Sequence, residues 1–222
     1  MKFMIHACPQ RMWYVADFLL PMLKEQGAEN ITVWNDVNRE GNLKSCMDAF
    51  ASLEGDGGTW HIQDDVLPCH DFVKRCEEHD EGLAYGFCCR NFNDRLDAAG
   101  EVYVCDAWNS FQCVRIPNKY ARECSEWVYS KKWQKESCLP ELQILFGLNK
   151  GDDTFFHEYI QIRHGYETAL NLKPNLVEHI DWLVGGSALQ TWRDYIARAE
   201  FFEDQYLVEE LSERIKRYNS AR

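Results

Sequence analysis

The chain lacks the residue spacings that mark several common classes of functional site. It has ten cysteines, but none form Cys-x-x-Cys, which argues against a zinc ribbon or a thioredoxin-like site. The absence of GxGxxG and of GxxxxGK[ST] weakens the Rossmann dinucleotide and P-loop interpretations. The absence of GxSxG argues against an α/β-hydrolase. The stretch HEYIQ at 157–161 lacks the second histidine of a HExxH zinc site.

Long apolar runs are missing as well. None approaches the roughly 18 residues that a transmembrane helix needs. The N-terminal stretch KFMIHA is too short for the apolar region of a signal peptide, and no cleavage pattern follows it. We therefore expect a cytoplasmic protein whose thiols are reduced and mostly buried. The even number of cysteines leaves the disulfide alternative open.

Basic residues are fewer than acidic residues. The chain carries 24 Lys and Arg against 36 Asp and Glu, a formal net charge of −12. This balance argues against non-specific binding to nucleic acid or to an anionic membrane. A local pocket that holds a metal could still bind an anionic ligand. With 222 residues, of which 45% are hydrophobic and 14% aromatic, the chain suits a globular α/β domain.

Strands and helices alternate in the first third of the chain. Apolar runs predict strands at 3–7, 31–34 and 59–63, and apolar spacings of three to four residues predict helices at 11–26 and 43–53. This order predicts a parallel sheet with right-handed crossovers.

The rest of the chain predicts both strands and helices, without the regular alternation of the first third. We expect a helix at 69–79, a strand at 83–89, two strands at 101–108 and 111–116 around a turn at Asn109-Ser110, and helices at 118–133, 140–148, 154–163 and 201–217. The predicted fold class is therefore α/β, with a mixed, mainly parallel central sheet flanked by helices and with C-terminal helices.

Two adjacent aspartates, Asp64 and Asp65, follow the strand in TWHIQDDV. Adjacent carboxylates repel, and burying either one costs several kcal/mol unless something compensates. A divalent cation would compensate, and so would exposure in an ordinary polar turn. Because ligands bind at the carboxyl ends of parallel strands, we expect the pair to lie near residues 6–11 and near Asp36.

A second acidic pair, Asp152-Asp153, precedes a predicted helix. These residues are either helix caps or hold a general base. The imidazole of His179 could join carboxylates in a site for Mn²⁺ or Mg²⁺, or it could be an ordinary buried histidine.

Backbone and guanidinium groups supply candidate phosphate contacts. The run Gly185-Gly186-Ser187 could present N–H groups to a diphosphate, although turns use the same residues. Arg11, after Pro9, is either a surface residue or a phosphate ligand.

Four stretches together resemble a known group of proteins: TWHIQDDV, FQCVRIPNKYARECSEW, KGDDTFF and PNLVEHIDWLVGGS. They resemble phage- and prophage-associated proteins of the glycosyltransferase-A fold, to which the bacterial protein majastridin is related. The resemblance covers roughly residues 3–190. It implies a domain that binds a nucleotide sugar, located in the cytoplasm of the bacterial host if the protein is phage-encoded.

The resemblance also implies roles for the acidic motif. Members of this fold hold Mn²⁺ against the donor diphosphate with Asp-x-Asp, and the matching triplet is Gln63-Asp64-Asp65. Asp65 would ligate the metal with His179. Asp64 would touch the ribose, or the metal through water, and Gln63 departs from the usual acid.

Further roles carry over to the other stretches. Asp152 and Asp153 match the position of the acceptor-side base, and Asp36 matches a residue that reads the nucleobase. The donor-binding set implied by the resemblance is Ala7, Cys8, Pro9, Arg11, Asp36, Gln63, Asp64, Gly185, Gly186 and Ser187.

We therefore predict a metal-dependent glycosyltransferase that moves a sugar from a nucleoside-diphosphate sugar, with UDP favoured, to an unknown acceptor. The cofactor would be Mn²⁺ or Mg²⁺. We expect one domain, with a nucleotide-binding half at 1–116, an acceptor-side half at 117–200 and a C-terminal helix at 201–222. The alternatives are a nucleotide-sugar-binding protein without transferase activity and a metal-dependent phosphodiesterase or nucleotidyltransferase. The oligomeric state is open.

Overall fold

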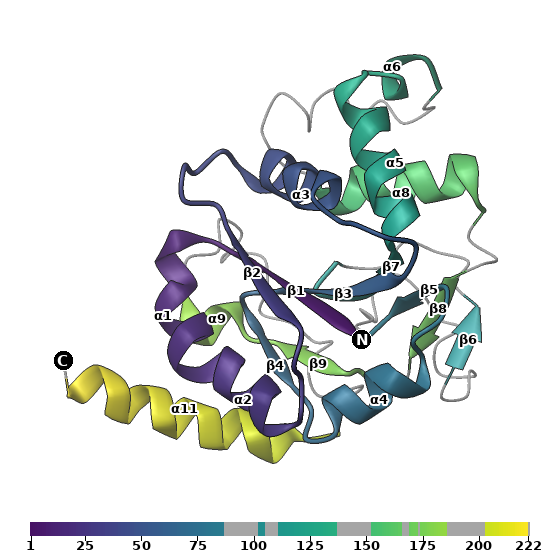
Figure 1. The fold of residues 1–222 in the computed structure, drawn as a ribbon. Coiled ribbons are helices and arrows are strands. Elements are labelled where there is room, and N and C mark those ends of the chain that lie inside the picture. The colour runs from purple at the N-terminus through teal and green to yellow at the C-terminus, as the bar shows by residue number, and fades with distance from the viewer. Residues whose placement is uncertain are drawn as a thin grey trace.

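A seven-stranded mixed sheet forms the centre of the molecule (Figure 1). The computed structural model describes residues 1–86, 102–104, 111–136, 152–165, 169–172, 174–185 and 203–221. The strands are β1 (Lys2–Ala7), β2 (Ile31–Asn35), β3 (Gly58–Gln63), β5 (Leu83–Tyr85), β6 (Val102–Val104), β7 (Cys113–Pro117) and β8 (Ala169–Leu172), in the order β2-β1-β3-β7-β5-β8-β6.

Most strands of this sheet point the same way. β2 and β3 flank β1 in parallel, and β5 is parallel to β8. β7 runs antiparallel between β3 and β5, and β6 runs antiparallel on β8. The predicted mixed, mainly parallel sheet is therefore confirmed.

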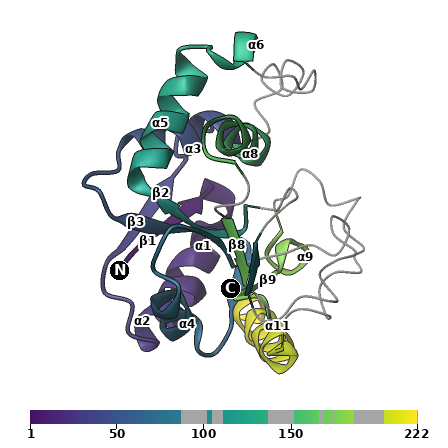
Figure 2. The same ribbon diagram turned by 90° about the vertical axis from the view of Figure 1, so that its right-hand side faces the viewer.

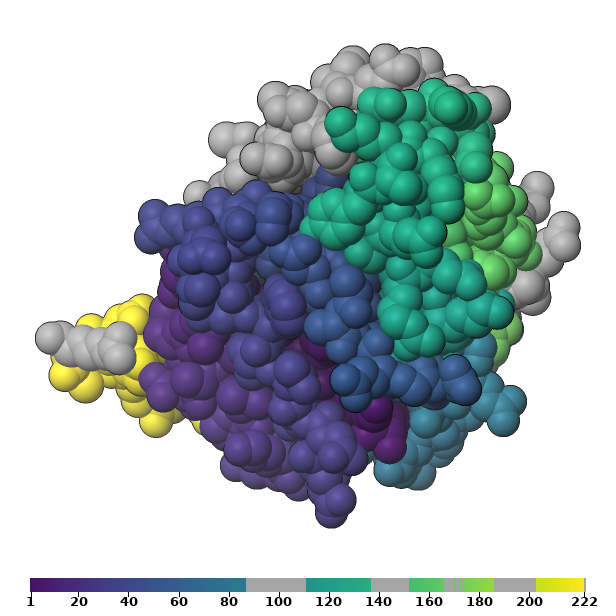
Figure 3. All heavy atoms as spheres, turned by 45° about the horizontal axis from the view of Figure 1, so that its top comes forward, coloured from purple at the N-terminus to yellow at the C-terminus, as the bar shows by residue number. Residues whose placement is uncertain are grey.

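Helices cover both faces of the sheet (Figure 2). One face packs under α3 (Asn42–Ala51), α5 (Asn118–Tyr129) and α8 (Asp152–Arg163). The other face packs on α1 (Met12–Tyr14), η2 (Val15–Leu19), α2 (Leu20–Glu25), α4 (Phe72–Glu78), α9 (Asp181–Val184) and α11 (Gln205–Ser220). The remaining described helices are short: η1 (Pro9–Arg11) and α6 (Trp133–Glu136). Figure 3 shows α5, in teal, beside part of α8, in green, on the right-hand part of the face drawn.

A second, two-stranded sheet lies beside the first. It pairs β4 (Val66–Pro68) with β9 (Val177–His179) in antiparallel fashion, and Val66 is opposite His179. This pairing brings a residue late in the chain to the end of β3, which β4 follows after a two-residue turn.

The prediction that the strands at 101–108 and 111–116 are neighbours around a turn is wrong. Both strands form, as β6 and β7, but β5 and β8 lie between them. Cys113, Val114 and Ile116 are fully buried, so β7 needs a strand on each side and takes β3 and β5. The short strands β4, β8 and β9 escaped prediction because three or four residues show too little periodicity.

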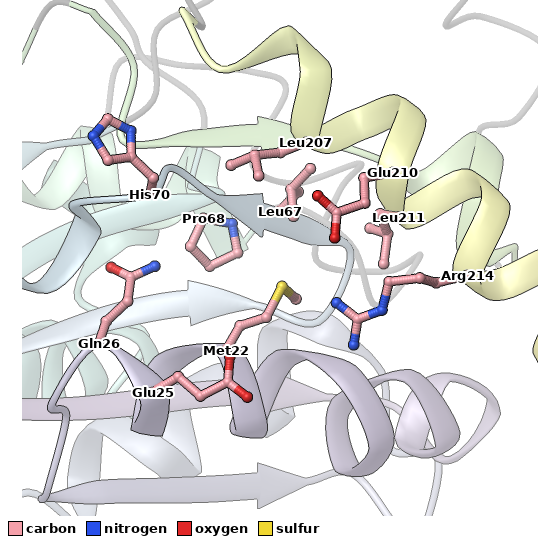
Figure 4. A pocket seen from close by; sticks show the side chains of 10 residues that line it. All are labelled: Met22, Glu25, Gln26, Leu67, Pro68, His70, Leu207, Glu210, Leu211 and Arg214. Atoms are coloured by element: carbon pink, nitrogen blue, oxygen red, sulfur yellow. The ribbon is translucent and has the colours of Figure 1, made fainter.

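The C-terminal helix packs across the N-terminal helices. Tyr218 stacks on Trp13 with 5.6 Å between ring centroids, and Leu211 and Ile215 are buried in the same cluster. A pocket of about 270 Å³ lies between α2, β4 and α11 (Figure 4). None of the helices in the described ranges is long and apolar enough to cross a membrane.

Candidate functional site

The carboxyl ends of β1, β2 and β3 meet at one edge of the sheet. The backbone N–H of Cys8, just after β1, donates to Oδ2 of Asp64, just after β3, at 2.6 Å. The N–H of Asp36, just after β2, donates to the carbonyl of Ala7 at 2.9 Å. The convergence that the order of elements predicts is therefore present.

Arg11 lies between the two aspartates of the QDD stretch. Asp64 and Asp65 are 3% and 4% exposed, so their charges need compensation inside the protein. Nη1 of Arg11 lies 2.5 Å from Oδ1 of Asp64 and 2.8 Å from Oδ2 of Asp65. Its Nε donates to the carbonyl of Gly185 at 2.7 Å. A guanidinium supplied from the β1 loop thus compensates both carboxylates.

His179 completes this cluster from the small sheet. Its Nε2 lies 3.2 Å from Oδ2 of Asp65, and the N–H of Ile180 donates to the carbonyl of Asp65 at 2.8 Å. The buried carboxylate of Asp181 lies 3.9 Å from Nδ1 of the same imidazole. The β4–β9 pairing therefore places a histidine and an aspartate on one side of the acidic pair.

The electrostatics reflect this crowding. Burial and the neighbouring Asp65 raise the pKa of Asp64, while Arg11 and the Cys8 N–H act in the opposite direction. For Arg11, burial alone would lower the pKa, but the two carboxylates outweigh it and the net shift is upward. Arg11 therefore stays charged.

The second acidic pair begins α8, and its members differ. Oδ1 of Asp153 accepts from the N–H of Thr154 at 2.7 Å and from its hydroxyl at 3.3 Å. Burial, then Asp153, and to a smaller extent Asp65 raise the pKa of Asp152 to about 7. The charge of Asp65 makes the smallest of these contributions to the pKa of Asp152.

Other predicted donor-binding residues have local roles. The carboxylate of Asp36 accepts from the N–H groups of Glu40 at 2.8 Å and Gly41 at 3.1 Å, so it shapes its own loop. Gln63 pairs in register with His6 at the end of β3. Pro9 opens η1, where its missing N–H costs nothing. The predicted Gly186 and Ser187 lie outside the described residues.

The donor atoms partly fit a divalent cation. Ligands at right angles around Mn²⁺ or Mg²⁺ with bonds of about 2.1 Å lie about 3 Å apart, close to the 3.2 Å between Asp65 Oδ2 and His179 Nε2. Within the described ranges, no three His, Cys, Asp or Glu side chains are grouped to hold a metal. A cation here would therefore take its other ligands from water and from a bound ligand, as Mg²⁺ commonly does.

Sequence reasoning missed two features near this edge. Asp181 stands two positions after His179, and that spacing is a signal that could have been read from EHID. Beneath the site, Nε2 of His6 and Nδ1 of His61 lie 2.7 Å apart, and burial lowers the pKa of His6 to about 4. Strand alternation alone does not show that these two histidines face each other.

Comparisons with known proteins give weak structural likeness. No protein-family model matches the chain, and no curated protein sequence matches it. The galactosyltransferase LgtC, in complex with donor and acceptor sugar analogues, has a TM-score of 0.46 and 14% identity, covering 96% of each chain. HddC from Yersinia pseudotuberculosis has a TM-score of 0.32 and 10% identity over 55% of this chain and 80% of its own.

A third solved structure is a putative glucose-1-phosphate thymidylyltransferase from Bacillus anthracis in complex with a sucrose. It has a TM-score of 0.35 and 12% identity over 57% of this chain and 75% of its own. With all three TM-scores below 0.5, the function rests on the geometry of the site, and the relation to phage proteins and majastridin stays a prediction.

Proposed function

We propose that this protein is a metal-dependent glycosyltransferase that uses a nucleoside-diphosphate sugar, with UDP favoured as the nucleotide. The main support for the proposal is a set of side-chain contacts at the carboxyl edge of the sheet, which connect Asp64, Asp65, Arg11 and His179. The acidic start of α8 is close enough for its charge to interact with Asp65. Ligands of α/β proteins bind at such edges.

The charges of the region favour a cation. The carboxyls of Asp64, Asp65, Asp152 and Asp153 outnumber the guanidinium of Arg11. A diphosphate would be repelled here unless a cation accompanied it. Asp65 and His179 would hold Mn²⁺ or Mg²⁺, which stabilises the negative charge of a departing nucleoside diphosphate as a Lewis acid.

Asp152 is our candidate for the base. In transfer, the acceptor oxygen bonds to the anomeric carbon, the bond from that carbon to the diphosphate breaks, and the hydroxyl proton passes to a carboxylate. A pKa of about 7 suits a carboxylate that accepts a proton near neutral pH. Asp153 is engaged with Thr154 and serves the start of the helix.

A second candidate is a nucleotide-sugar-binding protein without transferase activity. Two observations favour it. Gln63 stands at the first position of the acidic triplet, and Arg11 already neutralises the carboxylates that would hold the metal. Donor hydrolysis or transfer under conditions that saturate the nucleotide site would separate this candidate from the transferase.

The first experiment is calorimetric titration of UDP, GDP, CDP and ADP, each with and without Mn²⁺. We compare wild type, Asp65→Asn and the exposed control Asp56→Asn. We expect one nucleotide to bind only with Mn²⁺, Asp65→Asn to weaken it at least tenfold, and Asp56→Asn to bind like wild type. If none of the four binds under either condition, the nucleotide-sugar proposal is wrong.

The role of the base has its own measurement. Because a base must be deprotonated to act, kcat/KM for donor turnover should rise with pH and level off above about 7, the pKa of Asp152. Asp152→Asn should lose at least a hundredfold in kcat, and Asp153→Asn should lose less. An Asp152→Asn enzyme with wild-type kcat would remove Asp152 from the mechanism.

A further inference from the structure

The contacts of Arg11 have a consequence for metal binding at this site. We infer that Arg11 is a resident counter-ion that competes with a divalent cation for Asp64 and Asp65, so that the cation binds strongly only together with an anionic ligand. This inference rests on the proposed function, since the ligand meant is the diphosphate of the donor.

The shared oxygen atom makes the competition direct. Oδ2 of Asp65 lies 2.8 Å from Nη1 of Arg11 and 3.2 Å from Nε2 of His179. A cation held between Asp65 and His179 would sit within a few ångströms of the guanidinium, in a buried region where like charges repel strongly. The same Nη1 also contacts Asp64 at 2.5 Å, so the guanidinium offsets the charge of both carboxylates.

A bound diphosphate would relieve this repulsion. Its oxygens carry negative charge that offsets both the cation and the guanidinium, and guanidinium groups bind phosphate oxygens well. Arg11 is also anchored by the bond from its Nε to the carbonyl of Gly185 at 2.7 Å. Because the guanidinium is planar, the bond that fixes Nε also fixes the direction of the outer nitrogens, so a ligand would meet the fork where it already lies.

The arrangement couples the two binding events. Suppose that Arg11 lowers the affinity for the cation more when no diphosphate is bound than when it is bound. The cation and the diphosphate must then each raise the affinity for the other by the same factor. Removing the guanidinium would leave two buried carboxylates without their counter-ion, which favours cation binding strongly. The affinity for Mn²⁺ alone should therefore rise when Arg11 is neutralised.

The test measures Mn²⁺ binding by the loss of the electron paramagnetic resonance signal of free Mn²⁺, without nucleotide, on the full chain. We compare wild type with Arg11→Gln and with the matched control Arg115→Gln. Arg115 is also buried and holds Asp80 at 2.7 Å and the carbonyl of Gly82 at 2.5 Å, near Gly58 at the opposite end of β3.

We expect Arg11→Gln to bind Mn²⁺ at least tenfold more tightly than wild type, and Arg115→Gln to bind it like wild type. Adding UDP, GDP, CDP or ADP in turn should strengthen Mn²⁺ binding at least tenfold in wild type for one nucleotide, and by a smaller factor in Arg11→Gln. Mn²⁺ affinity in Arg11→Gln equal to or below that of wild type would overturn the inference.

If Arg11→Gln does not fold, Arg11→Lys carries the test. An ammonium group cannot reproduce the fork that contacts two carboxylates and a carbonyl together. We expect Mn²⁺ to bind Arg11→Lys at least threefold more tightly than wild type, and equal or weaker binding would overturn the inference.

The two proposals fail in distinguishable ways. Tighter Mn²⁺ binding by Arg11→Gln, with no nucleotide bound by wild type, would keep the counter-ion role and end the nucleotide-sugar proposal. Mn²⁺-dependent nucleotide binding by wild type, with unchanged Mn²⁺ affinity in Arg11→Gln, would keep the proposed function and end the counter-ion role.

Discussion

Individual carboxylates of the site differ because their nearest neighbours differ. Asp64 accepts from a guanidinium and a backbone N–H, and Asp153 accepts from the first residues of its own helix. Asp152 lies beside a second carboxylate, and its pKa rises to about 7. One residue type therefore serves as an ion-pair partner, as an acceptor for a backbone N–H in the first turn of a helix and as a candidate base.

The raised pKa of Asp152 predicts a pH dependence of stability. Between its unfolded pKa of 3.8 and its folded value of about 7, the native state holds a proton that the unfolded state has lost. The free energy of unfolding should therefore fall as pH rises through this window, and it should stay low above pH 7. Asp152→Asn should remove this loss.

We expect Asp152→Asn to be more stable than wild type at pH 8 by on the order of 2 kcal/mol, and nearly equal to it at pH 4. The full effect would be about 1.4 kcal/mol for each unit by which the pKa is shifted. We expect a smaller total because the side chain is only partly buried. Urea unfolding at the two pH values measures the difference, with the exposed Asp56→Asn as the control. A constant difference at both pH values would contradict the prediction.

At the scale of elements, β3 links two buried arginines at its opposite ends. Asp64 and Asp65 follow its carboxyl end and meet Arg11, while Gly58 begins it beside Arg115. A Cβ on Gly58 would lie far inside van der Waals contact with the Arg115 guanidinium, which Asp80 and the Gly82 carbonyl hold in place.

Gly58→Ala should therefore destabilise the protein by about 1–3 kcal/mol, the usual range for overpacking. Gly57→Ala is the matched control, because a Cβ there meets no atom within 4 Å and its φ is not positive. Thermal unfolding of both variants decides the matter. Equal stability of the two variants would show that Arg115 moves aside freely.

The docking of α11 depends on a few apolar side chains. Ile215 is 3% exposed and packs in the cluster that also holds Phe18 and Leu19. We expect Ile215→Ala to lower the free energy of unfolding by about 2–4 kcal/mol. The exposed Glu209→Ala on the same helix should change it by less than about 0.5 kcal/mol. Urea titrations at pH 7 compare the two, and a loss in Glu209→Ala equal to that in Ile215→Ala would point to helix propensity instead of packing.

At the scale of the whole molecule, the sheet separates two apolar clusters that both contain buried thiols. Cys76 and Cys113 belong to one cluster, and Cys46 and Cys124 belong to the other. All four are free, and burial raises the pKa of each thiol well above its ordinary value. Reaction at these thiols therefore requires opening of the core on their own side of the sheet.

We expect iodoacetamide at pH 8 to leave these four thiols unmodified in the native protein and to modify all four in urea. Peptide mass spectrometry reads each site separately. Rapid modification of Cys46 and Cys124 alone in the native protein would show that the α3–α5–α8 layer opens by itself. The protein would then not unfold as a single cooperative unit.

Much of the fold could be predicted from the chain alone. The first five elements and their parallel pairing follow from apolar periodicity, and Gly27, with φ of +91°, follows the first long helical segment as expected. The placement of β6 away from β7 could not be predicted, because strand order depends on which buried strand edges remain to be paired.

The candidate site divides in the same way. By itself, the sequence determined which polar residues follow the strands and therefore which edge of the sheet could hold chemistry, because strand direction fixes where carboxyl ends meet. Only the tertiary structure decided that Arg11 lies between Asp64 and Asp65, that the β4–β9 pairing brings His179 to them, and that the carboxylate of Asp153 accepts from the N–H of Thr154. The contacts of Arg11 and of His179 with the aspartates depend on distances of 2.5–3.2 Å between residues up to 114 positions apart in the chain, and long-range packing alone sets such distances.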